Sequence, residues 1–445
     1  MTDRREAAYA AVNAPRVLIA DLPRHVGRRV ELAGWLYNMR SKGRIRFLQL
    51  RDGSGRVQGV AVKGECDAES FAALASLRME ASLTVQGEVR ADDRAPSGVE
   101  LGVRAISVVH NPTDDYPIAK KEHGIDFLLE HRHLWLRSTR QEAMLRVRAR
   151  TAASMRRFFD DRGFVHVDTP ILTGSIGESA GTLFSLPYFD LGDAYLAQTG
   201  QLYLEAACAA LGRVYNFGPT FRAEKSKTRR HLTEFWMLEA EVAFLDNRGN
   251  LDLQEELICA VAADVVANCE AELHTLGRDL DPLRAVQRPF PRLDYGEAVA
   301  RLQAAGSRIA WGQDLGADDE STLSQAHERP VFVVNYPRAA KAFYMKRNPE
   351  DARTVLCADL LAPEGYGEII GGSQREDDYR LLSDRIREAR LPEEAYHWYL
   401  DLRRFGSVVH SGFGIGLERT VAWLTGTHHV RESAPFPRTL SRIYP

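Results

Sequence analysis

A basic segment between two apolar runs carries the densest set of reactive side chains in the sequence. Residues 222–231 (RAEKSKTRRH) hold five Lys or Arg and one His against a single Glu, in a chain whose net charge is only −3. Phe235 and Trp236 follow closely. Arginine binds phosphate oxygens through paired hydrogen bonds, so two strands joined by this loop could clamp a polyphosphate. A solvated hairpin tip is the simpler alternative.

Two glycine-rich segments could complete such a site. Residues 412–419 read GFGIGLER, and glycine at alternate positions of a strand clears one face, so a flat ligand could lie on the backbone. Residues 367–375 read GEIIGGSQR, in which Glu368 could bind Mg²⁺ close to a phosphate and to Arg375. Close helix–strand packing and a surface salt bridge are the respective alternatives.

The N-terminal quarter of the chain is rich in predicted strands. Short β-type runs occupy residues 30–40, 44–52, 56–64, 81–89 and 99–109, with one helix expected at 67–77. Five short strands and a helix suit a small barrel of the OB type, and a small sandwich is the alternative.

The remainder alternates between helices and strands. Apolar residues spaced three and four apart predict a helix over 141–161, which ends at Gly163. A strand over 164–170 follows and closes on Pro170, which could serve either core packing or a subunit interface. The absence of GxGxxG and GxxxxGK[ST] patterns argues against Rossmann and P-loop folds.

Composition narrows the class of protein. Hydrophobic residues make up 44% and aromatic residues 9%, which is enough for packed cores, and the near-neutral charge excludes a generally basic nucleic-acid coat. Five scattered cysteines without a CxxC pair argue against a disulfide framework or a Cys-rich zinc site. The charged N-terminus and the lack of a long apolar run predict a cytoplasmic, multidomain protein.

Taken in order, helix–strand–Pro170, strand–FRAE–RH–strand and glycine-rich strand–GLER–helix resemble the three signature motifs of class II aminoacyl-tRNA synthetases. The N-terminal region looks like the anticodon-binding domain of the aspartyl/asparaginyl/lysyl subgroup. The resemblance implies an α+β multidomain fold: an OB-fold barrel at 1–112, a hinge at 113–140, and at 141–445 a catalytic domain whose antiparallel sheet is flanked by helices. It also implies an ATP-dependent ligase.

One segment bears on the amino acid. Aspartyl enzymes carry Gln-Ser-Pro-Gln-x-x-Lys, whose lysine meets the substrate carboxylate, whereas residues 198–204 here read QTGQLYL and Glu205 follows. Loss of that cation favours a neutral amide, so the resemblance predicts asparagine, ATP and tRNA-Asn as substrates. Alternatives are an aspartyl enzyme of relaxed specificity that charges tRNA-Asp and tRNA-Asn, a non-catalytic RNA-binding paralogue, and an amidating paralogue without the barrel.

The resemblance also implies residue roles. For ATP it implies Arg222, Glu224, Arg230, His231, Phe235, Glu368, Gly414, Gly416, Leu417 and Arg419, among which Arg222, Glu224, His231 and Arg419 are the predicted catalytic residues. For the amino acid it implies Glu178, Gln201, Arg222 and Arg375, with specificity set by Leu204, Glu205 and Arg403.

The remaining implied roles concern metal, tRNA and assembly. Mg²⁺ is expected on Glu368, with Asp359 as a second candidate, although Gly371 stands where aspartyl relatives have a metal-assisting Ser. Phe47 would stack on an anticodon base that Gln58 hydrogen-bonds, unless Phe47 belongs to the barrel core. Pro170 and its strand are expected at a homodimer interface. Lys225 and Lys227 depart from many relatives and could alter contacts with the tRNA acceptor end.

Overall fold

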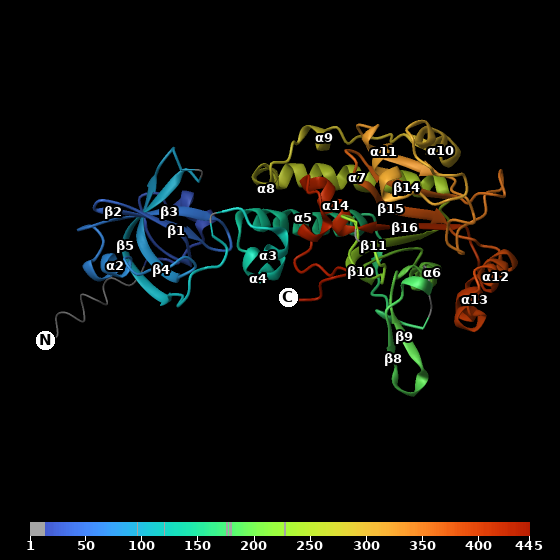
Figure 1. Ribbon diagram of the computed structural model, residues 1–445, viewed down its shortest axis with the longest axis horizontal. Coiled ribbons are helices and arrows are strands. Elements are labelled where there is room, and N and C mark those ends of the chain that lie inside the picture. The colour runs from blue at the N-terminus through green and yellow to red at the C-terminus, as the bar shows by residue number, and fades with distance from the viewer. Residues whose placement is uncertain (1–13, 96, 120, 175–176, 178–179, 227) are drawn as a thin grey trace. The chain divides into compact units, whose positions relative to one another are not determined.

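The structure is a computed structural model, and it describes residues 14–95, 97–119, 121–174, 177, 180–226 and 228–445. The chain forms two units, Met1–His123 and Gly124–Pro445 (Figure 1). The division lies within the residues predicted as a hinge, and the domain limits given above stay predictions.

The first unit is a closed five-stranded barrel of order β1-β2-β3-β5-β4, as predicted, which rules out the sandwich. Buried and part-exposed residues alternate along β3 and β4, and the inward set forms one apolar core. The predicted helix starts where expected, with Asp67 accepting the backbone N–H of Ser70, but it ends already at Ala73. The elements of this unit are η1 (Ile19–His25), β1 (Arg29–Lys42), β2 (Ile45–Arg51), β3 (Arg56–Val62), α2 (Ala68–Ala73), β4 (Ser82–Ala91) and β5 (Val99–His110).

The second unit is built on an eight-stranded sheet of order β12-β13-β14-β15-β16-β11-β10-β6. Its inner pairs are antiparallel, and only the two outermost pairs, β12–β13 and β10–β6, are parallel. A separate three-stranded sheet has the order β7-β9-β8. The strands are β6 (Val165–His166), β7 (Leu172–Thr173), β8 (Ser185–Pro187), β9 (Asp193–Leu196), β10 (Arg213–Phe221), β11 (Glu234–Ala243), β12 (Arg292–Asp294), β13 (Val331–Val334), β14 (Cys357–Ala362), β15 (Gly367–Gln374) and β16 (His410–Gly416).

Helices cover one face of this sheet. The long helices α5 and α7 run side by side and, with α14, bury the largest apolar cluster against β10, β11, β15 and β16 (Figure 1). The α-helices of this unit are α3 (Ile125–Glu130), α4 (Arg132–Trp135), α5 (Thr139–Asp160), α6 (Gln201–Leu211), α7 (Asn247–Asn268), α8 (Glu270–Leu276), α9 (Asp281–Arg284), α10 (Tyr295–Ala304), α11 (Ala317–Gln325), α12 (Tyr379–Glu388), α13 (His397–Arg404) and α14 (Leu417–Thr425). Short 3-10 helices are η2 (Ala180–Thr182), η3 (Phe189–Leu191), η4 (Glu393–Tyr396) and η5 (Val430–Glu432).

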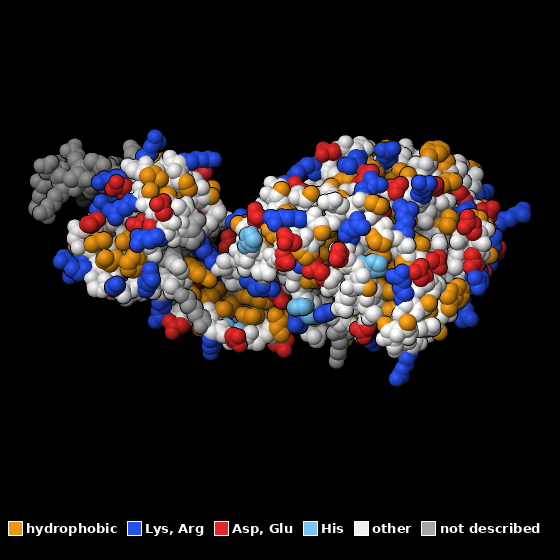
Figure 2. All heavy atoms as spheres, turned by 90° about the horizontal axis from the view of Figure 1, so that it is seen from above, with side chains coloured by type: hydrophobic (Ala, Val, Ile, Leu, Met, Phe, Trp, Pro, Cys, Tyr) orange, Lys and Arg blue, Asp and Glu red, His pale blue; other side chains and the backbone are white. Residues whose placement is uncertain are grey.

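Helix and sheet together confirm the predicted α+β catalytic architecture. On the face of this unit drawn in Figure 2, acidic and basic side chains are interspersed, in keeping with the small net charge. Among the described residues, none of the helices combines the length and the apolar run that crossing a bilayer requires.

Candidate active site

The face of the large sheet opposite the helices carries a cavity of about 300 Å³. Residues of β11 alternate between the two faces: Leu238 and Ala240 enter the helix-covered core, whereas Met237, Glu239 and Glu241 line the cavity. Many residues singled out from the sequence meet here: Gln201, Arg222, Glu224, Arg230, His231, Phe235, Asp359, Glu368, Arg375, Gly414, Gly416 and Arg419.

Other predicted residues lie elsewhere. Leu204 packs with Cys208 and Val214, and Leu417 enters the main core, so neither side chain faces the cavity. Glu205 and Arg403 lie buried outside the cavity lining. Glu178 and Lys227 fall outside the described residues.

The basic loop joins β10 to β11 and brings four cavity residues together. The Arg222 guanidinium lies 5.4 Å from the centre of the Phe235 ring, and Nε2 of His231 is 3.4 Å from the Glu224 carboxylate. On its other side, Nδ1 of His231 contacts the hydroxyls of Ser226 and Thr228. Burial and the neighbouring Arg419 lower the pKa of His231, so the ring is neutral at pH 7.

Two further arginines of the cavity already have carboxylate partners. Arg419 donates to Oε2 of Glu368 at 2.8 Å, and Arg230 donates to Oε2 of Glu320 at 2.9 Å. Arg230 also donates to the carbonyl of Gly365 at 2.6 Å and to Ser321. The Arg230 guanidinium, predicted to contact ATP, is therefore bound by groups of the protein itself.

The two predicted metal ligands flank a glycine. Asp359 on β14 pairs in register with Gly371 on β15, and a Cβ atom at Gly371 would lie 3.0 Å from Oε1 of Glu368 and 3.6 Å from Oδ1 of Asp359. Within the described ranges, no three His, Cys, Asp or Glu side chains gather into a group that could hold a metal. Two carboxylates that converge on one glycine suit Mg²⁺, which takes its remaining ligands from water and substrate phosphates.

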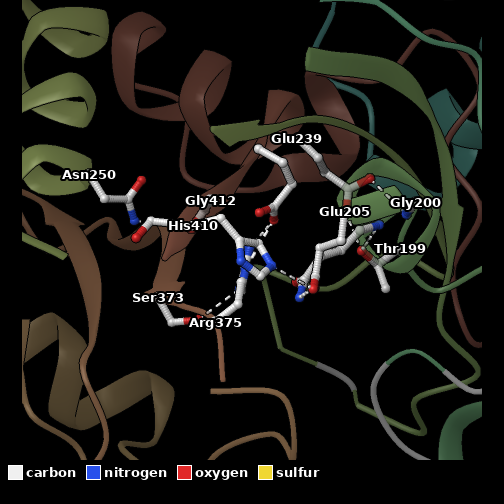
Figure 3. Close-up of polar contacts among 12 residues, drawn as sticks. Thr199, Gly200, Glu205, Glu239, Asn250, Ser373, Arg375, His410 and Gly412 are labelled. Atoms are coloured by element: carbon white, nitrogen blue, oxygen red, sulfur yellow. Dashed lines mark hydrogen bonds and ion pairs between the residues drawn. The ribbon is translucent and has the colours of Figure 1, made fainter. Parts of the chain in front are cut away.

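The end of the cavity beneath β16 holds a buried ion pair that the sequence analysis missed. Arg375 donates to Oε1 of Glu241, with Nε at 3.0 Å, and to the Ser373 hydroxyl at 2.7 Å (Figure 3 labels Arg375 and Ser373). The side chains of Glu241 and Arg375 are only 1% and 3% exposed. Among the described residues, Oε2 of Glu241 has no hydrogen-bond partner although it is buried. Burial raises the pKa of Glu241 to about 7, against the lowering effect of Arg375.

Strand register explains how Glu241 fits. Glu241 stands opposite Gly412, and a Cβ atom there would lie 2.1 Å from Oε1 of Glu241. Gly412, the first glycine of the alternating series 412–416, therefore makes room for the Glu241 carboxylate rather than for a ligand. Two-residue periodicity could have identified Glu241, because it places this residue on the same face as Glu239.

A second buried carboxylate, Glu205, lies behind this pair. It accepts hydrogen bonds from Tyr399 at 2.8 Å, Arg403 at 2.7 Å, Nε2 of His410 at 3.0 Å and the Gln201 amide at 3.0 Å (Figure 3 shows Glu205 beside His410). Burial alone would raise the pKa of Glu205, but Arg403 and His410 lower it far below its ordinary value. Glu205 thus fixes Gln201, which does face the cavity.

Glu239 holds the turn before α6. It accepts the backbone N–H of Gly200 at 2.8 Å and the hydroxyl of Thr199 (Figure 3). A Cβ atom at Gly200 would lie 2.2 Å from Nδ2 of Asn216, so this turn accepts only glycine. The N-terminus of α6, which starts at Gln201, is thereby anchored to β10 and β11.

In the barrel, Phe47 and Gln58 lie on the outer surface of the strands. Leu48 and Leu50 enter the core, whereas Phe47 is not part of it, which removes the core alternative. The Arg40 guanidinium stacks 4.7 Å from the centre of the Phe47 ring and donates to the Gln58 amide oxygen at 3.4 Å. Phe47, Gln58 and Arg40 therefore form one cluster.

Two family models match the chain. One described as "tRNA synthetases class II (D, K and N)" matches residues 124–440, and "OB-fold nucleic acid binding domain" matches residues 30–109. The first spans the sheet and the cavity just described. The fold and the site therefore define a class II tRNA synthetase.

Full-length relatives narrow the class. The asparagine--tRNA ligase of Chloroflexus aurantiacus is 54% identical over 437 residues, which cover 97% of this chain and 99% of the relative. The asparaginyl-tRNA synthetase of Pyrococcus horikoshii, solved with asparaginyl-adenylate, has a TM-score of 0.94 and 44% identity, covering 97% of this chain and 100% of that one. That of Entamoeba histolytica, also with asparaginyl-adenylate, has a TM-score of 0.87 at 31% identity, with coverage of 97% and 100%. The chain belongs to the asparagine--tRNA ligase family.

Proposed function

We propose that the protein attaches asparagine to tRNA-Asn in two steps. The asparagine α-carboxylate attacks the α-phosphorus of ATP. The bond between that phosphorus and the oxygen that bridges it to the β-phosphate breaks. Pyrophosphate departs, and asparaginyl-adenylate is formed. A terminal ribose hydroxyl of the tRNA then attacks the adenylate carbonyl and releases AMP. The observation that carries the choice of asparagine is the unpartnered Oε2 of Glu241 beside Arg375 at the buried end of the cavity.

The first step needs positioning and charge neutralisation more than a covalent nucleophile. Arg222 is suited to the α-phosphate and the attacking carboxylate, because it lines the cavity at the mouth of the basic loop. Phe235 offers a ring for the adenine, Glu224 an acceptor for its amino group, and Arg419 a second cation for the nucleotide.

The side-chain amide fits the Glu241–Arg375 pair. An amide carries an acceptor and a donor side by side, and the pair offers the complement: guanidinium N–H groups and the open Oε2 of Glu241. An aspartate carboxylate would leave Oε2 without a donor and meet it with like charge, which is costly in a buried site. The charged Oε2 of Glu241 therefore disfavours an aspartyl enzyme of relaxed specificity.

Discrimination should therefore depend on pH. Because the pKa of Glu241 is raised to about 7, the side chain is protonated below that pH and charged above it. The protonated form donates a hydrogen bond and no longer repels aspartate, so we expect the ratio of asparagine to aspartate activation to fall as the pH is lowered from 8 to 6. Pyrophosphate exchange measured with each amino acid across this range tests the trend, and a constant ratio would contradict it.

We propose that Glu368 and Asp359 hold Mg²⁺ when ATP is bound. The ion would neutralise charge on the phosphates and bridge them to the protein. Support comes from the two carboxylates, both of which lie close to Gly371, where a Cβ atom would stand 3.0 Å from Glu368 and 3.6 Å from Asp359.

We propose that the barrel reads the anticodon through Phe47 and Gln58. Phe47→Ala should weaken tRNA-Asn binding about tenfold, since stacking on an aromatic ring contributes ~1–3 kcal/mol per base, and should leave pyrophosphate exchange unchanged. Phe71→Ala is the matched control: its ring also carries an arginine, Arg46 at 5.0 Å, but packs against the barrel core. The control should lower stability without a specific loss of tRNA affinity, and equal affinities in both variants would contradict the proposal.

We further propose a homodimer in the cytoplasm, where tRNA and ATP are available. Support for the dimer comes from β6, an edge strand whose Val165 is 43% exposed, and from exposed Ile171 and Leu172 beside Pro170. An apolar sheet edge of this kind can be covered by a second copy.

Charging of tRNA transcripts tests the proposed function as a whole. The purified protein, with ATP, Mg²⁺ and labelled asparagine, should acylate tRNA-Asn and not tRNA-Lys, and should give little product with labelled aspartate on either tRNA-Asn or tRNA-Asp. Comparable aspartylation of both tRNAs would overturn the proposal in favour of the relaxed aspartyl enzyme.

A further inference from the structure

Lys341 is a buried cation in the cavity wall to which the sequence assigned no role. It lies between β13 and β14 and is only 12% exposed. Its Nζ is 2.8 Å from Oδ2 of Asp359, 3.1 Å from Oδ1 of Asp314 and 3.9 Å from the centre of the Tyr336 ring. The Lys341 ammonium group thus pairs with Asp359, one of the two carboxylates that flank Gly371.

Each carboxylate at this end of the cavity already has a cation. Lys341 pairs with Asp359, Arg419 pairs with Glu368 at 2.8 Å, and Arg230 pairs with Glu320 at 2.9 Å. A divalent cation that enters without a nucleotide would therefore meet carboxylates that are already paired, and the positive Lys341. ATP changes the local charge, because its phosphates bring several negative charges.

We propose that Lys341 is a resident cation that keeps Asp359 closed to divalent metal until ATP is bound, and that metal then replaces its ammonium on Asp359. The inference rests on the proposed ATP site. Asp314 can retain the displaced ammonium, since its Oδ1 already lies 3.1 Å from Nζ and it belongs to a different segment from Asp359. A lysine suits this exchange because its charge sits on a flexible stem with three donors.

Mn²⁺ titration followed by electron paramagnetic resonance tests the proposal, because the signal of free Mn²⁺ disappears on binding. The wild-type protein should bind Mn²⁺ tightly only with a non-hydrolysable ATP analogue. Lys341→Met should bind Mn²⁺ without the analogue at least about tenfold more tightly than the wild type, since an uncompensated carboxylate attracts the ion. Lys341→Arg, which keeps the charge, should behave as the wild type.

A double variant locates the metal. Adding Asp359→Asn to Lys341→Met should abolish the gain, whereas a gain that persists, or a Lys341→Met affinity equal to that of the wild type, would overturn the proposal. If Lys341→Met fails to fold, Lys341→Gln removes the charge while keeping a polar end for Asp359 and Asp314.

The titration is independent of the reaction itself. Asparagine-dependent exchange by the wild type together with nucleotide-independent Mn²⁺ binding would remove the role of Lys341 and leave the proposed function intact. A wild-type protein that binds Mn²⁺ only with nucleotide but shows no asparagine-dependent exchange would overturn the proposed function and leave the role of Lys341 intact.

Discussion

Replacing Arg222 by alanine is expected to lower asparagine-dependent ATP–pyrophosphate exchange about 10²- to 10³-fold, the usual cost of losing one donor to the charge that develops in a transition state. Arg222 lines the cavity and lies over the Phe235 ring, where adenine is proposed to bind. The loss should appear mainly in kcat, because the guanidinium acts on the reacting phosphate and carboxylate.

Arg229 provides the matched control on the same loop. Its side chain is exposed and does not line the cavity, so Arg229→Ala should keep exchange close to that of the wild type. Thermal unfolding should be unchanged in both variants, because Arg222 is only part-buried. Near-normal exchange in Arg222→Ala, or equal losses in the two variants, would contradict the assigned role.

The second large effect concerns the choice of amino acid. Glu241→Gln should lower the ratio of asparagine to aspartate activation about 10²-fold, because like charge in a buried site costs several kcal/mol and the variant removes it. The glutamine oxygen can still accept from Arg375, and its amide nitrogen would donate to an aspartate carboxylate. Exchange kinetics with each amino acid measure the ratio.

Glu418→Gln is the control for this change. Glu418 is another buried glutamate of the cavity, but it pairs with Arg148 at 2.7 Å and accepts the backbone N–H of Trp236 at 3.0 Å. This variant can lower the rate, yet it should leave the ratio of asparagine to aspartate activation unchanged. A ratio that stays the same in Glu241→Gln as well would show that Glu241 does not select the amide.

Local patterns predicted the frame of the molecule well. Alternating apolar residues identified the five barrel strands, and 3.6-residue spacing placed α5 at 141–161, against an observed Thr139–Asp160. The strand expected over 164–170 is regular only at Val165–His166, although the backbone N–H of Val167 still donates to Tyr215 on β10; Pro170 has no N–H to donate. Where a strand ends depends on its hydrogen bonds to neighbouring strands, and the sequence of the strand alone does not specify those bonds.

Most of the predicted site residues line one cavity, but the carboxylates that pair with them were not predicted. The basic loop, Glu368, Arg375 and Arg419 converge as expected, since sheet order brings β11, β15 and β16 together. Which carboxylate pairs with Arg375 depends on strand register: Glu241 stands opposite Gly412 and accepts from Arg375. Leu204 was assigned to specificity by its place in a motif, yet helix α6 turns it into a core cluster.

The most direct test of the account is ATP–pyrophosphate exchange by the purified wild-type protein with asparagine, aspartate and lysine at matched concentrations and at pH 8. We expect rapid exchange with asparagine and little with the other two, since Glu241 is charged at that pH and its Oε2 requires a donor. Exchange with aspartate as fast as with asparagine would contradict the proposed reading of the Glu241–Arg375 pair.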